Sequence, residues 1–163
     1  MKIKYTNYNI VFKEVPDETT LAINISNCPH KCEKCHSDYL RQNIGKLLTL
    51  DELDTIIKYF YGITCICFMG GDANKKDINR LANYIKINHP TLKVAWYSGN
   101  NTISSKIDIK NFDYIKIGEY DKEKGPLNSK TTNQIFYKVN HKWFKKPQLE
   151  NITHLFYNDN KKF

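Results

Sequence analysis

The strongest constraint on the fold is a short stretch near the middle of the chain, Thr64 to Met69 (TCICFM). After its first residue every side chain is apolar, with no polar alternation. An apolar run of this length is typical of a strand buried on both faces of a sheet. Gly70-Gly71-Asp72 ends the run. We therefore expect a central strand that leads into a tight glycine turn.

Helical and strand patterns alternate around this strand. The clearest helix is predicted over Thr49 to Tyr61, where Thr49 and Glu52 form a capping-box pattern. A second helix is expected from about Asn74 to Asn88 and a weak one from Thr102 to Lys110. The further expected strands are an N-terminal edge strand within Ile3 to Val15, Leu21 to Ile25, Leu92 to Tyr97, Phe112 to Ile117, and Gln134 to Val139.

This alternation predicts the fold class. Strand, helix, strand, helix, strand is the order of a parallel sheet with right-handed crossovers. The sequence shows too few such units for a closed eight-fold barrel. We therefore expect an α/β fold, a partial, open (β/α) barrel with a mainly parallel sheet, forming a single domain over residues 1–163.

Chemically versatile residues follow the ends of the expected strands. Cys28 comes soon after one strand, Asp72 and Ser98 follow the next two, and Gly118 follows a fourth. Ligands of open α/β sheets bind at the carboxyl ends of the strands. We expect these residues to meet at one edge of the sheet.

Three of the five cysteines form a compact motif. Cys28, Cys32 and Cys35 have the spacing C-x3-C-x2-C. A four-iron cluster needs four ligands, so this motif would leave one iron open to an external ligand. A zinc site completed by His30 or His36 is the alternative, and unbound thiols are another. Cys65 and Cys67 alternate within the buried strand and are interpreted as core residues.

The turn Gly70-Gly71-Asp72 also allows two interpretations. Two glycines let a ligand approach the backbone closely, and Asp72 could accept from a cationic group. A zwitterionic amino acid group would suit both. A tight strand-to-helix turn without any ligand is the simpler interpretation of this segment alone.

Taken together, the cysteine motif and the glycine turn resemble the radical S-adenosylmethionine superfamily. Within it, the chain is similar to the activating proteins of anaerobic ribonucleoside-triphosphate reductase. The similar stretches, in chain order, are Ile25–Ser37, Phe68–Ala73, Trp96–Gly99 and Thr131–Gln134. Two departures are Lys34, where the superfamily commonly has an aromatic residue, and Gly118-Glu119-Tyr120, where relatives that activate formate lyases have an Asp-x-Lys pair.

The resemblance implies a set of roles. Cys28, Cys32 and Cys35 would hold a [4Fe–4S] cluster whose open iron binds S-adenosyl-L-methionine. An electron from a flavodoxin or ferredoxin-type donor would cleave this cofactor to a 5′-deoxyadenosyl radical. That radical would install a glycyl radical on the anaerobic reductase, the protein substrate. The implied cofactor-binding residues are His36, Gly70, Gly71, Asp72 and Ser98.

Two other functions remain open from the sequence. One is a radical S-adenosylmethionine enzyme that acts on a small molecule, and the other is a zinc-binding interaction module. The net charge of +8 comes from lysines spread along the chain, densest over residues 138–146. We interpret that stretch as a solvated face, with a docking surface as the alternative. Direct nucleic-acid binding is not expected.

The expected compartment is the cytoplasm. The first residues contain no apolar core of a signal peptide, and no apolar run reaches the ~18 residues of a membrane span. An odd number of cysteines, five, with three of them clustered, favours metal or redox chemistry over a disulfide framework.

Overall fold

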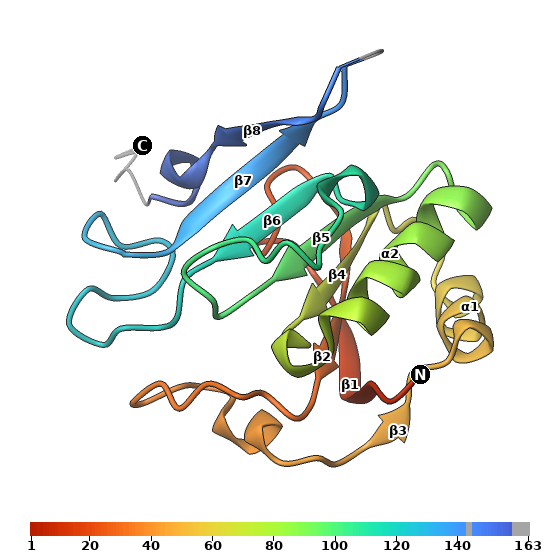
Figure 1. The fold of residues 1–163 in the computed structure, drawn as a ribbon, viewed down its shortest axis with the longest axis horizontal. Helices are drawn as coiled ribbons and strands as arrows, with labels where there is room; N and C mark the ends of the chain where they lie inside the picture. The colour runs from red at the N-terminus through yellow and green to blue at the C-terminus, as the bar shows by residue number, and fades with distance from the viewer. Residues whose placement is uncertain (143–144, 158–163) are drawn as a thin grey trace.

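A computed structural model describes residues 1–142 and 145–157 of the chain. Its described part contains one eight-stranded sheet with the strand order β3-β1-β2-β4-β5-β6-β7-β8 (Figure 1). The strands are β1 Lys4–Val11, β2 Thr20–Ile25, β3 Lys46–Leu47, β4 Cys65–Met69, β5 Lys93–Tyr97, β6 Tyr114–Ile117, β7 Ile135–Asn140 and β8 Gln148–Asn151. The α-helices are α1 Leu50–Tyr59 and α2 Lys75–Asn88, and the short 3₁₀ helices are η1 Asp38–Arg41, η2 Asp72–Asn74, η3 Ile109–Asn111 and η4 Thr153–Phe156.

The sheet is mixed, so the predicted α/β partial, open (β/α) barrel with a mainly parallel sheet is wrong. Strands β2, β4, β5 and β6 run parallel to one another. Strands β1 and β3 on one side, and β7 and β8 on the other, pair antiparallel. Residues 1–142 and 145–157 contain only two α-helices, so most of the regular structure is strand.

The missing third helix has a local cause. The expected helix at Thr102 to Lys110 is replaced by an irregular segment that ends in the turn η3. Its side-chain oxygens bind nearby backbone amides instead: Ser104 Oγ accepts from Lys106 N at 3.3 Å, and Asp108 Oδ1 accepts from Lys110 N at 3.1 Å. Such local bonds compete with helical hydrogen bonds and favour turns.

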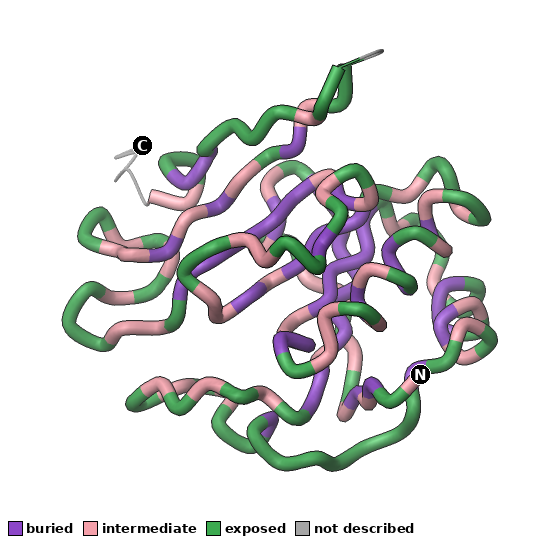
Figure 2. The backbone as a smooth tube through the Cα atoms, in the orientation of Figure 1, coloured by how far each residue is buried: buried purple, intermediate pink, exposed green. Residues whose placement is uncertain are grey.

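The two predicted helices are confirmed and cover one face of the sheet. Thr49 Oγ1 accepts from Glu52 N at 3.1 Å and caps the start of α1. Apolar side chains of α1 and α2, including Leu53 and Leu81, pack in one core with Phe68 and Trp96 of the sheet. Figure 2 shows that the buried backbone runs through the central strands and the inner sides of the helices.

The opposite face has a smaller core without an α-helix. Cys65, Cys67 and Phe136 of the sheet pack there against Val15 and Ile152. Both cysteines are fully buried, as expected for core residues. Burial raises the pKa of each thiol well above its ordinary value, so both stay protonated.

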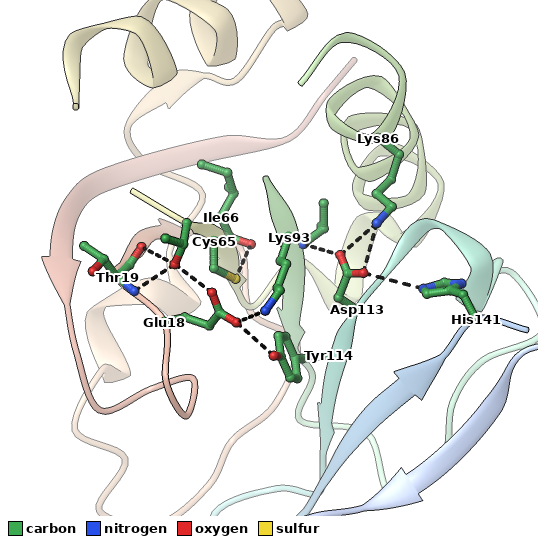
Figure 3. Close-up of polar contacts among 11 residues, drawn as sticks. Glu18, Thr19, Cys65, Ile66, Lys86, Lys93, Asp113, Tyr114 and His141 are labelled. Atoms are coloured by element: carbon green, nitrogen blue, oxygen red, sulfur yellow. Dashed lines mark hydrogen bonds and ion pairs between the residues drawn. The ribbon is translucent and has the colours of Figure 1, made fainter. Parts of the chain in front are cut away.

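Two carboxylates fasten the amino ends of the parallel strands (Figure 3). Buried Glu18 accepts from Lys93 Nζ of β5 and, at 2.9 Å, from Tyr114 Oη of β6. Asp113, just before β6, accepts at 2.9 Å with both oxygens from Lys86 Nζ of α2. This polar network lies at the amino-end edge of the parallel strands. The cysteine loop begins at the opposite edge, after the carboxyl end of β2.

Two further expectations from the sequence concern a membrane span and the basic stretch 138–146. Within its two ranges, no helix combines the length and the apolar character that crossing a bilayer requires. Trp143 and Phe144, which form the middle of the basic stretch 138–146, lie outside the described residues.

Candidate functional site

A cavity of about 180 Å³ opens at the carboxyl edge of the parallel strands. Three free cysteines, Cys28, Cys32 and Cys35, contribute to its lining, and each is half-buried. Loops after β2, β4, β5 and β6 supply the remaining walls, so segments far apart in sequence meet here as the strand-end pattern predicts. Apolar lining comes from Ile25, Leu40, Met69 and Tyr97.

Hydrogen bonds to backbone carbonyls hold the cysteine loop in place. Cys28 N donates to Leu40 O of η1 at 2.8 Å, and Arg41 Nη2 donates to Cys32 O at 2.5 Å. Lys34 has a left-handed backbone, with φ of 55°, and turns the chain between the second and third cysteines. These contacts direct the loop back across the end of the sheet.

The donor set of the loop fits an iron–sulfur cluster. In the described part of the chain, no three His, Cys, Asp or Glu side chains gather closely enough to hold a single metal ion. A four-iron cluster is a larger body, with one thiolate on each ligated iron. Three free thiols around one cavity suit such a body and leave one iron without a protein ligand. Burial raises the pKa of the Cys28 thiol, so metal binding there must displace a proton.

Asp72 is the structural centre of the site. Its side chain is 1% exposed. Oδ1 accepts from Ser98 Oγ and Asn100 Nδ2, both at 2.6 Å, and Oδ2 accepts from Gly99 N at 2.8 Å. His30 Nε2, from the cysteine loop, lies 3.2 Å from Oδ2. One carboxylate therefore joins the turn after β4, the turn after β5 and the cysteine loop.

The two glycines before Asp72 have structural roles of their own. Gly70 lines the cavity with φ of +100°, and its amide donates to Tyr97 O at 2.9 Å. This amide is thus committed to the sheet and is not free to donate a hydrogen bond to an anionic ligand. Gly71 is buried, and a Cβ there would lie 2.5 Å from Ile78 Cδ1 of α2. The close approach of Ile78 and the φ of +93° both favour glycine at this position.

The structure brings most of the predicted site residues to this cavity. Those that line it are Cys28, Cys32, Cys35, Gly70, Asp72 and Ser98. His36 and Gly71 do not line it. His36 is exposed, and its ring centroid lies 6.1 Å from that of Tyr120.

Lys116 is a lining residue that the sequence analysis missed. It lies in β6, is buried, and donates from Nζ to Gly118 O at 2.6 Å. Burial lowers its pKa to about 8, against the opposing effects of Asp72, Cys32 and Cys35. The available signal was a lysine inside the otherwise apolar end of a strand, Tyr114–Ile117.

A larger hollow of about 630 Å³ lies on the face without α-helices. Its lining includes Phe12, Glu14, Leu127 and Phe156, and Tyr97 belongs to both hollows. None of the predicted site residues lines it. Size alone therefore does not identify the functional site, and the thiols favour the smaller cavity.

Comparison with known proteins gives one match. A family model described as a 4Fe-4S single cluster domain matches residues 19–140. The matched range runs from just before β2 to the end of β7 and contains all three cysteines of the loop. The curated proteins and the solved structures gave no match.

Proposed function

This chain belongs to the family of 4Fe-4S single cluster domains, and from this membership we propose that it is a radical S-adenosylmethionine activase. In this proposal Cys28, Cys32 and Cys35 hold the [4Fe–4S] cluster. One iron would be left without a protein ligand, where the amino and carboxylate groups of S-adenosylmethionine could bind. The observation that supports this most is the shared cavity, where three thiols, the Asp72 carboxylate and the Lys116 ammonium meet.

The charges around the cavity suit a zwitterionic ligand. Asp72 has several donors already, and its buried negative charge attracts an ammonium group without a new direct bond. Lys116 supplies the opposite charge from β6, two strands away from β4. Ser98 and Gly118 add small polar walls, and the apolar lining limits the access of water.

The cluster and cofactor supply the radical chemistry. When bound, they would use one donated electron to cleave S-adenosylmethionine to methionine and a 5′-deoxyadenosyl radical, which would take a hydrogen atom from a glycine of the protein substrate. The chain's own residues hold the thiolate set, orient the amino acid moiety and keep the radical away from bulk water.

We propose that the protein substrate is the anaerobic ribonucleoside-triphosphate reductase. The chain would activate it in the cytoplasm by installing a glycyl radical on it. The support is the resemblance in four stretches, all of which contribute to the site region. Cys28 and its loop belong to the first, Gly70 and Asp72 to the second, Ser98 to the third, and Gln134, which also lines the cavity, to the fourth. A flavodoxin or ferredoxin-type protein would donate the electron.

The test is anaerobic reconstitution with iron and sulfide, followed by reduction and addition of S-adenosylmethionine. We expect brown protein, about four irons per chain, and 5′-deoxyadenosine, plus an EPR-visible glycyl radical when the reductase is added. Cys28→Ala, Cys32→Ala and Cys35→Ala should each lose iron and product. Colourless protein with one bound zinc and no product would refute the proposal.

A further inference from the structure

We propose that a basic hollow beside Asp72 docks the acidic electron-donor protein that reduces the cluster. The hollow, of about 210 Å³, is formed by the start of α2 and the segment before η3. This inference rests on the proposed function, because only a reductive reaction requires an electron from outside the chain.

The exposed charge of this hollow is positive. Lys75, Lys76 and Lys106 contribute to its lining, and Lys76 and Lys106 are exposed. The single carboxylate in the lining, that of Asp72, is almost entirely buried and already accepts several hydrogen bonds. An approaching protein therefore meets ammonium groups with little compensating negative charge.

The hollow adjoins the cysteine cavity through one residue. Lys75 Nζ donates to Asp72 O at 2.7 Å on one side, while His30 of the cysteine loop lies 3.2 Å from Asp72 Oδ2 on the other. Asp72 lines both hollows. A protein seated on Lys76 and Lys106 would therefore lie next to the wall of the proposed cluster site.

A second surface hollow next to the cysteines has the opposite balance. It lies between the cysteine loop and the loop after β6 and has a volume of about 290 Å³. Around Cys32 its lining has four acidic and two basic side chains: Glu33, Glu119, Asp121, Glu123, Lys31 and Lys122. Lys122 Nζ is paired with Glu33 Oε1 at 2.6 Å, which leaves acidic charge in excess. An acidic donor is repelled there and attracted to the lysines on the Asp72 side.

The redox step is a single electron transfer. The reduced donor loses one electron, the cluster passes from [4Fe–4S]²⁺ to [4Fe–4S]⁺, and no covalent bond forms or breaks. A flavodoxin hydroquinone or a reduced ferredoxin supplies such an electron. Long-range attraction between unlike charges raises the encounter rate of two proteins by about 10–10³-fold at low ionic strength.

The experiment compares two charge-reversal variants with the same change in net charge. The test variant is Lys76→Glu with Lys106→Glu; Lys75 is left in place because it bonds to Asp72. The control is Lys142→Glu with Lys145→Glu, two exposed residues of the β7–β8 connection. Figure 1 shows this connection at the end of the molecule opposite to the cysteine loop.

Stopped-flow absorbance would follow cluster reduction by an acidic flavodoxin under anaerobic conditions at low salt. We expect the test variant to be reduced at least ~10-fold more slowly than the wild type, and the control to stay within about twofold of it. The difference should shrink at high salt, where the Debye length falls to about 3 Å and long-range attraction between the two proteins is largely screened. Photoreduced 5-deazaflavin, a small uncharged reductant, should reduce all three proteins equally fast.

Three results would overturn the inference. They are equal rates with flavodoxin, an equal slowing of test and control variants, and a slowing of the test variant with 5-deazaflavin as well. Flavodoxin binding measured by interferometry, with the same two variants, tests the surface without any cluster. If flavodoxin reduces or binds the wild type in the expected pattern but no 5′-deoxyadenosine forms, the proposed function fails and the docking surface stands.

Discussion

Asp72→Asn tests whether this buried carboxylate organises the site. The side chain is 1% exposed and accepts from Ser98, Gly99 and Asn100, while His30 lies 3.2 Å from it. Asparagine keeps the shape and removes the charge and one acceptor atom. The substitution should therefore loosen the loop after β5 without opening a cavity.

The magnitude follows from the orientation that the new amide adopts. With its nitrogen in the place of Oδ2, it faces the Gly99 amide, which is fixed in the backbone and has no way to accept. With its nitrogen in the place of Oδ1, the Ser98 hydroxyl can turn to accept, and Asn100 loses its acceptor. One or two hydrogen bonds to a charged group are lost, at roughly 1.5–3 kcal/mol each. We expect the free energy of unfolding to fall by about 1.5–6 kcal/mol.

The assay is urea unfolding of the cluster-free protein under reducing conditions, with the unfolded fraction monitored by circular dichroism. Asp51→Asn is the control, because Asp51 is exposed in the first turn of α1 and its loss should cost only about 0.5 kcal/mol. If Asp72→Asn unfolds at the same urea concentration as the wild type, the carboxylate does not organise these loops, and our reasoning about the site is wrong.

Three further predictions concern single buried side chains. Glu18→Gln should lower the free energy of unfolding at pH 7 by about 1–3 kcal/mol. Burial raises the pKa of Glu18, but hydrogen bonds from Lys93, Thr64 and Tyr114 outweigh this and hold the pKa below its ordinary value. In urea unfolding measured over a pH series, the difference should therefore shrink below the ordinary pKa of glutamate and vanish below the lowered pKa of the folded state. Cys65→Ala should leave the iron content of reconstituted protein unchanged, and loss of iron would show that Cys65 is a ligand. Lys116→Met should stabilise the cluster-free protein at pH 7 by about 1–3 kcal/mol while weakening S-adenosylmethionine binding in a calorimetric titration. Because the pKa of Lys116 is about 8 when folded and 10.5 ordinarily, this gain should shrink as the pH rises from 8 to 10.

Local signals in the sequence were enough to predict the centre of the fold. The cap of α1 at Thr49 is formed by the two residues that the capping-box pattern identifies. The apolar run that became β4 lies in the middle of the sheet, with parallel neighbours on both sides. The convergence of the cysteine loop, Asp72 and Ser98 followed from strand direction alone, because parallel strands end at the same edge.

The flanks of the sheet could not be predicted in this way. All four residues of β8, Gln148–Asn151, are exposed, so no alternation of polar and apolar residues marks this strand. Its position depends on antiparallel pairing with β7, the preceding strand, and this pairing leaves no periodic signal in the sequence of β8. The helix predicted over Thr102 to Lys110 was wrong for a different reason. The few apolar residues of this segment resemble a helical pattern, but Ser104 and Asp108 bind nearby backbone amides and favour turns.

Lys116 shows why side-chain chemistry inside a strand is hard to assign from sequence. In an antiparallel surface sheet a lysine at this position would point to water, and nothing local distinguishes that case from burial. The difference comes from β5 and β7, which flank β6 on both sides, and from the loops that close over its carboxyl end. The tertiary arrangement therefore decides that this ammonium faces the same cavity as Cys32, and it is this arrangement that makes its charge available to an anionic ligand.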